Sequence, residues 1–241
     1  MSFAGDVKKE LCGLIPEKEC CRGAEYSGML LFANSFSPTS VKLLTESFET
    51  AKKLATYCYE ISGMDASIQA RQSEMYILTV EREEDCAAIF SHINGEMGPF
   101  LRINQKNLKE SCCVQAFLRG AFLSCGSVTD PKKEYHLEFV TPYFRLAADL
   151  MDLLSFAGFS PKSVIRKSNQ IVYFKESEAI EDLLTYIGAQ NAVFEIMNVK
   201  IYKDIRNNTN RVNNCETANL GKTVSAAARQ VEAIQKLSRM G

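Results

Sequence analysis

The sequence predicts an α+β fold made of two copies of one α-β-α-β-β-α unit, followed by a helical C-terminal tail. Two observations predict this duplication. An apolar helix with an interior glycine occurs twice, as Tyr26-Ser-Gly-Met-Leu-Leu-Phe-Ala-Asn34 and as Leu118-Arg-Gly-Ala-Phe-Leu-Ser-Cys-Gly-Ser-Val128. The same order of helices and strands follows each copy, as expected for an internal repeat.

In the first half, we expect helices at 6–15 and 24–33, a strand at 41–48, a helix at 49–62, strands at 66–72 and 75–81, and a helix at 83–93. The assignments rest on apolar residues that recur with helical or alternating spacing. Gly63 is expected to end its helix, since glycine accepts the left-handed conformation common at helix ends.

In the second half, we expect a helix at 108–125, a strand at 133–140, a helix that opens at Thr141-Pro142 and closes at Gly158, strands at 162–167 and 170–175, and a helix at 177–187. A constant shift of 95 positions aligns Gly63 with Gly158, Arg71 with Arg166 and Glu81 with Glu176 without a gap.

Beyond residue 190 the character of the chain changes. Residues 191–206 are compatible with a basic helix, but 207–214 contain five asparagines, and asparagine favours turns and caps over helix interiors. A second helix is therefore expected after this break. It carries apolar residues at alternating spacings of four and three, namely Leu220, Val224, Ala227, Val231 and Ile234. Such a seam predicts a partner surface.

Composition limits the class of protein. The 241 residues suffice for one large domain or two small ones, and a hydrophobic content of 46% suits a packed core. No apolar run reaches the roughly 18 residues of a membrane span, and the N-terminus has no apolar signal segment. Nine cysteines in such a chain indicate reduced cytosolic thiols. We therefore expect a cytoplasmic protein without a membrane partner.

The repeated interior glycines predict a close helix contact. Gly28 and Gly120 each cost a helix roughly 1 kcal/mol relative to alanine. Since both repeats use the same position, we expect the two helix backbones to touch at the repeat interface. The alternative is that each is a tolerated interior glycine.

A helix with a central glycine, closing in small residues and present in both halves, resembles the LAGLIDADG motif of homing endonucleases. In that family, an acid just before the final glycine holds the catalytic metal. Here the two positions are Ala33 and Cys125, which do not supply the hard oxygen ligands that magnesium requires. We therefore expect no catalytic residue, no metal and no enzyme activity; an active endonuclease is the disfavoured alternative.

The spacing of the cysteines argues against a zinc site. Cys20-Cys21 and Cys112-Cys113 are adjacent pairs, without the two-residue spacer of zinc ribbons. Neither histidine has a metal-like spacing to a cysteine. From spacing alone, these thiols are expected to be buried or incidental, and no cofactor is expected.

The charge balance argues for weak nucleic-acid binding. The net charge is −1 and the pI is near 6.2, whereas strong DNA-binding domains usually have a pI above ~9. In LAGLIDADG proteins, two antiparallel sheets form a saddle over the DNA major groove. The matching hairpins here offer candidates for phosphate contact, which are Lys42, Arg71, Lys132, Lys133, Lys162, Arg166 and Lys167. Glutamates lie among them, so an ordinary mixed-charge surface is the alternative.

Three stretches together resemble the WhiA family of bacterial regulators: residues 1–11, 117–131 and 210–220. The resemblance covers essentially the whole chain. It implies a degenerate LAGLIDADG domain joined to a C-terminal helix-turn-helix DNA-binding domain. It also implies a nucleoid-associated role in transcription control, sporulation, cell division or chromosome segregation, with double-stranded DNA and other regulatory proteins as partners. The alternative is a protein-interaction or autoregulatory module that does not contact DNA.

The expected organisation has four segments. They are an N-terminal helical segment (1–22), a first repeat (23–105), a second repeat (106–190), and a helical linker with the start of a truncated helix-turn-helix domain (191–241). Because only the first helix of that domain is expected, near 218–238, this chain alone should bind DNA weakly.

Overall fold

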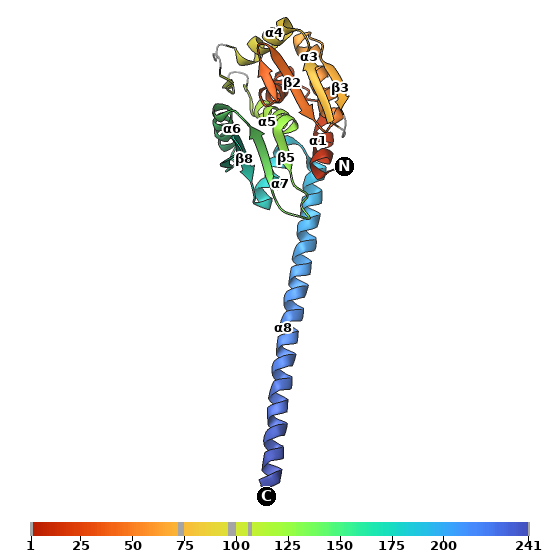
Figure 1. Ribbon diagram of the computed structural model, residues 1–241, viewed down its shortest axis with the longest axis vertical. Helices are drawn as coiled ribbons and strands as arrows, with labels where there is room; N and C mark the ends of the chain where they lie inside the picture. The colour runs from red at the N-terminus through yellow and green to blue at the C-terminus, as the bar shows by residue number, and fades with distance from the viewer. Residues whose placement is uncertain (1, 72–74, 96–99, 106–107, 241) are drawn as a thin grey trace. The chain divides into compact units, whose positions relative to one another are not determined.

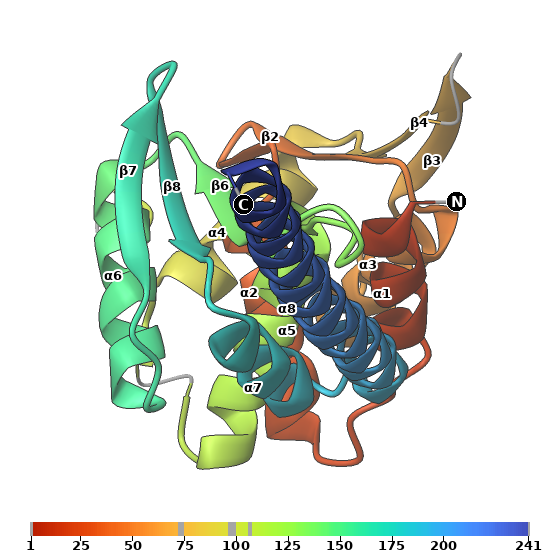
Figure 2. The ribbon, with the colours of Figure 1, turned by 90° about the horizontal axis from the view of Figure 1, so that it is seen from below.

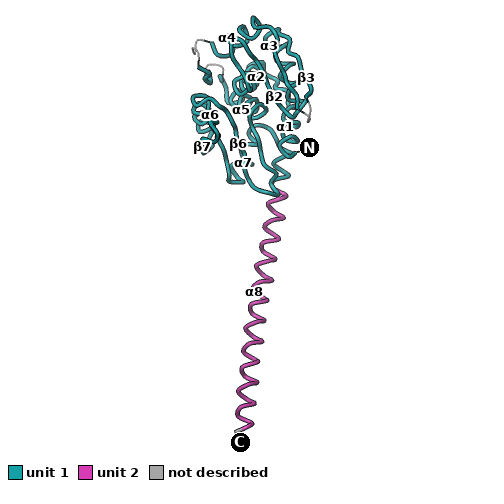
Figure 3. The backbone as a smooth tube through the Cα atoms, in the orientation of Figure 1, with its two compact units in different colours: residues 1–196 teal, residues 197–241 magenta. Residues whose placement is uncertain are grey.

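The computed structural model describes residues 2–71, 75–95, 100–105 and 108–240. The chain forms two compact units, Met1–Ile196 and Met197–Gly241, which are coloured separately in Figure 3. Unit 1 contains both repeats. Positions 72 and 106, where two of the expected boundaries fall, lie outside the described residues.

The first repeat follows a short N-terminal helix (Figure 1). The N-terminal helix is α1 (Phe3–Cys12), and the elements of the repeat are α2 (Glu19–Leu31), β1 (Ser35–Ser37), β2 (Ser40–Thr45), α3 (Phe48–Ser62), β3 (Ser67–Arg71), β4 (Met75–Val80) and α4 (Glu83–Asn94). Helix α2 starts before the expected residue 24 and therefore runs across the expected boundary between 22 and 23.

The second repeat has the same order. Its elements are α5 (Ser111–Cys125), β5 (Gly126–Val128), β6 (Leu137–Thr141), α6 (Phe144–Phe156), β7 (Lys162–Arg166), β8 (Asn169–Phe174) and α7 (Ser177–Ile187). The sheets are antiparallel with matching strand orders, β1-β2-β4-β3 and β5-β6-β8-β7. The predicted duplication is confirmed by this match.

Each repeat has one strand more than the sequence predicted. Strands β1 and β5 have three residues each, too few to show a period, and they form by pairing with β2 and β6. The strand expected at 133–140 begins only at Leu137, so Lys133 lies in the preceding turn.

The gapless alignment of the two repeats holds as far as the hairpins, and beyond them it needs a one-residue gap. Arg71 and Arg166 end the equivalent strands β3 and β7. The second hairpin closes through Lys167 and Ser168, whose φ angles of 47° and 68° fit a tight two-residue turn. Since the first hairpin is one residue longer, β4 and β8 align with a shift one smaller, and the gapless match of Glu81 with Glu176 is wrong.

The two glycine-bearing helices, α2 and α5, pack directly against each other at the repeat interface. A Cβ atom built on Gly28 would overlap the carbonyl oxygen of Phe117, and one on Gly120 would overlap the carbonyl oxygen of Glu25. The predicted close backbone contact is therefore confirmed. It also fixes how the two repeats sit within unit 1.

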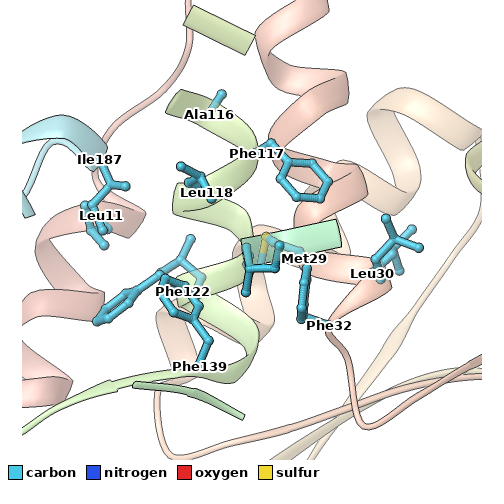
Figure 4. Close-up of a cluster of buried hydrophobic side chains, with 14 of the residues drawn as sticks. Leu11, Met29, Leu30, Phe32, Ala116, Phe117, Leu118, Phe122, Phe139 and Ile187 are labelled. Carbon is cyan, nitrogen blue, oxygen red and sulfur yellow. The ribbon is translucent and has the colours of Figure 1, made fainter. Parts of the chain in front are cut away.

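The main core surrounds this helix pair (Figure 4). Phe32 meets Phe117 edge-on with ring centroids 6.3 Å apart, and Phe122 meets Phe139 of β6 at 5.9 Å. Leu11 of α1 is fully buried in the same cluster. Helices α3 and α4 cover one face of the first sheet and α6 covers one face of the second, which leaves the other faces available.

Helix α8 (Gln190–Met240) is a single helix of 51 residues, so the break predicted at 207–214 is wrong. Each asparagine costs a helix less than about 1 kcal/mol relative to alanine. Residues 207–214 are all exposed, so the flanking helical residues, and not tertiary contacts, continue the helix through them. The apolar seam is exposed; Leu220, for example, is 66% exposed. In the part of the chain that the structure describes, no helix has the length and apolar character needed to span a bilayer.

Candidate nucleic-acid interface

The open face of the first sheet carries Lys42. Along β2, Val41 and Leu43 are buried beneath the helices while Lys42 and Leu44 are exposed, because side chains alternate across a strand. Lys42 pairs in register with Thr79, and Arg71 pairs with Met75 at the end of β3. By this register, Arg71 and Lys42 belong to the same open face.

The open face of the second sheet carries Lys162 and Arg166. Lys162, Val164 and Arg166 occupy every second position of β7, a fully exposed edge strand, so they share one face, and Arg166 pairs with Asn169 beside the turn. Lys162 is already paired, since its Nζ lies 2.7 Å from Oε1 of Glu176. This bond raises the pKa of Lys162 and lowers the pKa of Glu176.

The remaining candidates lie in turns. Lys132 and Lys133 are exposed in the turn before β6, where Asp130 accepts a hydrogen bond from the Lys132 backbone N–H. Lys167 occupies the tight turn between β7 and β8. The β3–β4 and β7–β8 hairpins lie on opposite sides of unit 1 and reach toward the same end (Figure 2). The structure therefore places Arg71 and Arg166 on two matching hairpins.

Sequence reasoning missed an aromatic patch on the second sheet. His136 stacks on Tyr173 with ring centroids 5.8 Å apart, and Lys175 lies over the same tyrosine ring at 5.5 Å. The His136 Nε2 atom is 2.9 Å from Glu138 Oε2. Tyr173 pairs in register with Glu138 and with Lys162, so the patch belongs to the open face. The alternation of side chains along β8 was the sequence signal that could have revealed this patch.

The ends of the motif helices are poorly suited to hold magnesium. Ala33 is buried and offers no ligand atom. Burial raises the pKa of the Cys125 thiol to about 12, although Lys8 of α1 lies close enough to oppose the rise. At neutral pH this thiol is protonated, and a protonated thiol does not supply the hard oxygen ligands that magnesium requires.

Two glycine-bearing helices packed between two antiparallel sheets define a LAGLIDADG-like domain. Family models agree: residues 114–206 match the WhiA LAGLIDADG-like domain, and residues 209–241 match the WhiA C-terminal HTH domain. The chain is 34% identical over 98% of its length to the probable cell division protein WhiA of Alkaliphilus metalliredigens, covering 80% of that protein. It is 38% identical over 98% of its length to the protein of the same name from Ruminiclostridium cellulolyticum, covering 79%. The chain belongs to the WhiA family.

Solved structures show the same fold. The chain matches full-length WhiA from Thermatoga maritima with a TM-score of 0.73 and 23% identity, over 98% of this chain and 78% of that one. It matches the N-terminal LAGLIDADG domain of WhiA with a TM-score of 0.61 and 23% identity, over 78% and 94% of the two chains. The predicted family and fold class are both confirmed.

Proposed function

We propose that this chain is a noncatalytic, DNA-binding regulator of transcription whose LAGLIDADG-like unit contacts duplex phosphates through the open faces of its two sheets. The observation that carries the proposal is the equivalent placement of Arg71 and Arg166, both exposed at the ends of matching hairpins. Arginine contacts phosphates well, since its planar group donates several hydrogen bonds. The match of 209–241 to a helix-turn-helix model supports DNA as the partner.

Binding through unit 1 should be weak and strongly salt-dependent. The whole chain has a net charge of −1, so attraction comes from local clusters only. Lys162 is partly neutralised by Glu176, which leaves Lys42, Arg71, Arg166 and the turn lysines as the main candidates. We propose cell division as the regulated process, because the relatives are named as probable cell division proteins. We propose the bacterial nucleoid as the place of action. Chromosome segregation and sporulation are further candidates from the family resemblance.

The proposed organisation keeps the four expected segments, with the first repeat starting at α2. Residues 191–241 would act as the helical linker and as the start of the helix-turn-helix domain. The exposed seam of α8 supports this assignment, because a helix in such a domain needs an apolar face to pack on its neighbours.

The test measures fluorescence anisotropy of a labelled duplex as the protein is titrated at several salt concentrations. We expect the affinity to fall steeply with salt, by a slope of about 0.9 per phosphate contact on a log–log plot. The double change Arg71→Glu, Arg166→Glu should flatten that slope by about 2. The control, Lys52→Glu, alters an exposed lysine of α3 on the helix-covered side. Equal slopes for all three proteins would remove the two arginines from the interface.

A protein-interaction module without DNA contact is the second candidate. The observation in its favour is the exposure of Val164 (48%) and Ile165 (65%) on the edge strand β7, a position that offers unpaired backbone groups to a partner strand. Absence of any duplex binding at low salt would favour this function over the first.

A further inference from the structure

The two adjacent cysteine pairs meet at the N-terminal ends of α2 and α5. Cys20 and Cys21 are the second and third residues of α2, and Cys112 and Cys113 hold the same places in α5. The Sγ atoms of Cys20, Cys21 and Cys113 all lie within 4.8 Å of one another. Cys112 adjoins Cys21, and its thiol also donates to Oε2 of Glu110 at 3.2 Å. The duplication therefore brings together two adjacent pairs of cysteines that are far apart in sequence.

This thiol cluster is mostly shielded from water. Cys21 is 6% exposed and Cys113 is fully buried, while Cys20 and Cys112 are partly buried. Burial, together with the neighbouring thiols, raises the pKa of Cys21, and burial raises the pKa of Cys113. A soft divalent ion binds thiolates and not thiols, so zinc binding to this cluster would release protons.

The surrounding electrostatics favour thiolates once an ion is present. Neither α2 nor α5 has a side-chain hydrogen bond at its N-cap, and the cysteines lie in the first turn of each helix. The free N–H groups of a first turn give each helix end roughly half a positive charge. Two such ends converge on the cluster. Lys18, at its rim, is paired with Glu110 at 2.6 Å and adds little net charge.

We propose that Cys20, Cys21, Cys112 and Cys113 bind one zinc ion, which ties the N-terminal ends of the two motif helices together. Four thiolates form a closed donor set of the kind that structural zinc sites use, with no position left for substrate. The role is structural and lies beyond the proposed DNA binding. It also replaces the expectation, drawn from the adjacent spacing alone, that these thiols are incidental.

The zinc content of the reduced 241-residue chain tests this proposal. We expect about one zinc per chain by native mass spectrometry, consistent with one closed four-ligand site. Cobalt(II) added to the metal-free chain should give the absorption of tetrahedral thiolate coordination. Cys21→Ser and Cys113→Ser should each weaken zinc binding by more than about 100-fold. Mutation of even a residue that only supports a metal ligand typically lowers metal affinity by about 10–100-fold. The control, Cys215→Ser, changes an exposed cysteine of α8 and should bind zinc as the parent does.

Buried substitutions can prevent folding, so the partly exposed pair supplies a second test. The double variant Cys20→Ser, Cys112→Ser should keep its far-ultraviolet circular dichroism spectrum but lose zinc and the cobalt absorption. The proposal is overturned if the folded, reduced parent binds no zinc, or if this double variant retains it. A disulfide within the cluster of the freshly purified, metal-free parent, found by thiol counting, would overturn it as well.

Discussion

Glu25 of α2 accepts two hydrogen bonds from Arg119 of α5, at 3.1 and 2.9 Å, in the interior of the repeat interface. The other carboxylate oxygen lies 2.6 Å from Nζ of Lys53 on α3. Lys53 also donates to the carbonyl oxygens of Leu11 and Leu14, while Arg119 donates to that of Ile187. A single, fully buried carboxylate thus links five helices, α1, α2, α3, α5 and α7.

Glu25→Gln should destabilise unit 1 strongly. The amide has nearly the same shape but carries no charge, so two cations would remain buried without a counter-charge. Loss of one partner from a buried ion pair typically costs about 3–5 kcal/mol. Thermal or urea unfolding followed by circular dichroism measures this change.

The control for this change is Glu60→Gln on the exposed surface of α3, which should alter stability by less than about 0.5 kcal/mol. A Glu25→Gln variant as stable as this control would show that the buried pair is not needed to hold the repeats together.

Gly28→Ala and Gly120→Ala should each loosen the contact between α2 and α5. The new methyl group would overlap a backbone carbonyl of the opposite helix, which cannot move away as a side chain can. Overpacking of this kind costs about 1–3 kcal/mol or more. Unfolding experiments should show the loss for both variants.

Gly23→Ala gives a matched control within the same helix. No atom lies within 4 Å of a Cβ built on Gly23, so alanine should stabilise α2 by up to about 1 kcal/mol. If Gly23→Ala and Gly28→Ala changed stability in the same direction and by the same amount, the close contact would not be the reason for the interior glycine.

The sequence predicted those features that depend on local pattern. Gly63 and Gly158 do follow helices and adopt φ angles of 68° and 94°, as a left-handed helix end requires. Repetition of the glycine helix predicted the interface between α2 and α5. The short strands β1 and β5 escaped prediction because pairing with a neighbour, and not their own residues, creates them.

The site was predicted less completely, because its contacts join residues that lie far apart along the chain. Lys162 carries the expected charge, but its pairing with Glu176 follows from how β7 and β8 align. The cysteine pairs lack metal-like spacing, yet the offset that relates Gly28 to Gly120 also relates Cys20 to Cys112. Comparison at that offset would have shown that both pairs occupy the same end of the two motif helices.

No cleavage of plasmid DNA is expected with magnesium or manganese. Ala33 has no ligand atom, and the Cys125 thiol, whose pKa burial raises to about 12, stays protonated at neutral pH. Divalent ions therefore lack the paired carboxylates that would hold them between attacking and leaving oxygens. Agarose gels after long incubation provide the measurement. Two controls apply to any cut that persists through purification. The cutting activity must elute with this protein on a sizing column, and it must also occur with an Ala33→Leu variant. A metal-dependent cut that passes both controls would contradict the nonenzymatic proposal.

Glu176→Gln should strengthen DNA binding by unit 1. The change releases the Lys162 ammonium group from its 2.7 Å ion pair and removes one negative charge from the same surface. If Lys162 then contacts a phosphate, the salt dependence of binding should steepen by about 0.9 on a log–log plot. Anisotropy titrations of the duplex at several salt concentrations measure the slope.

Glu60→Gln removes the same charge from the exposed side of α3 and serves as the control. Parallel salt plots for Glu176→Gln and Glu60→Gln would place Lys162 outside the DNA-contacting face.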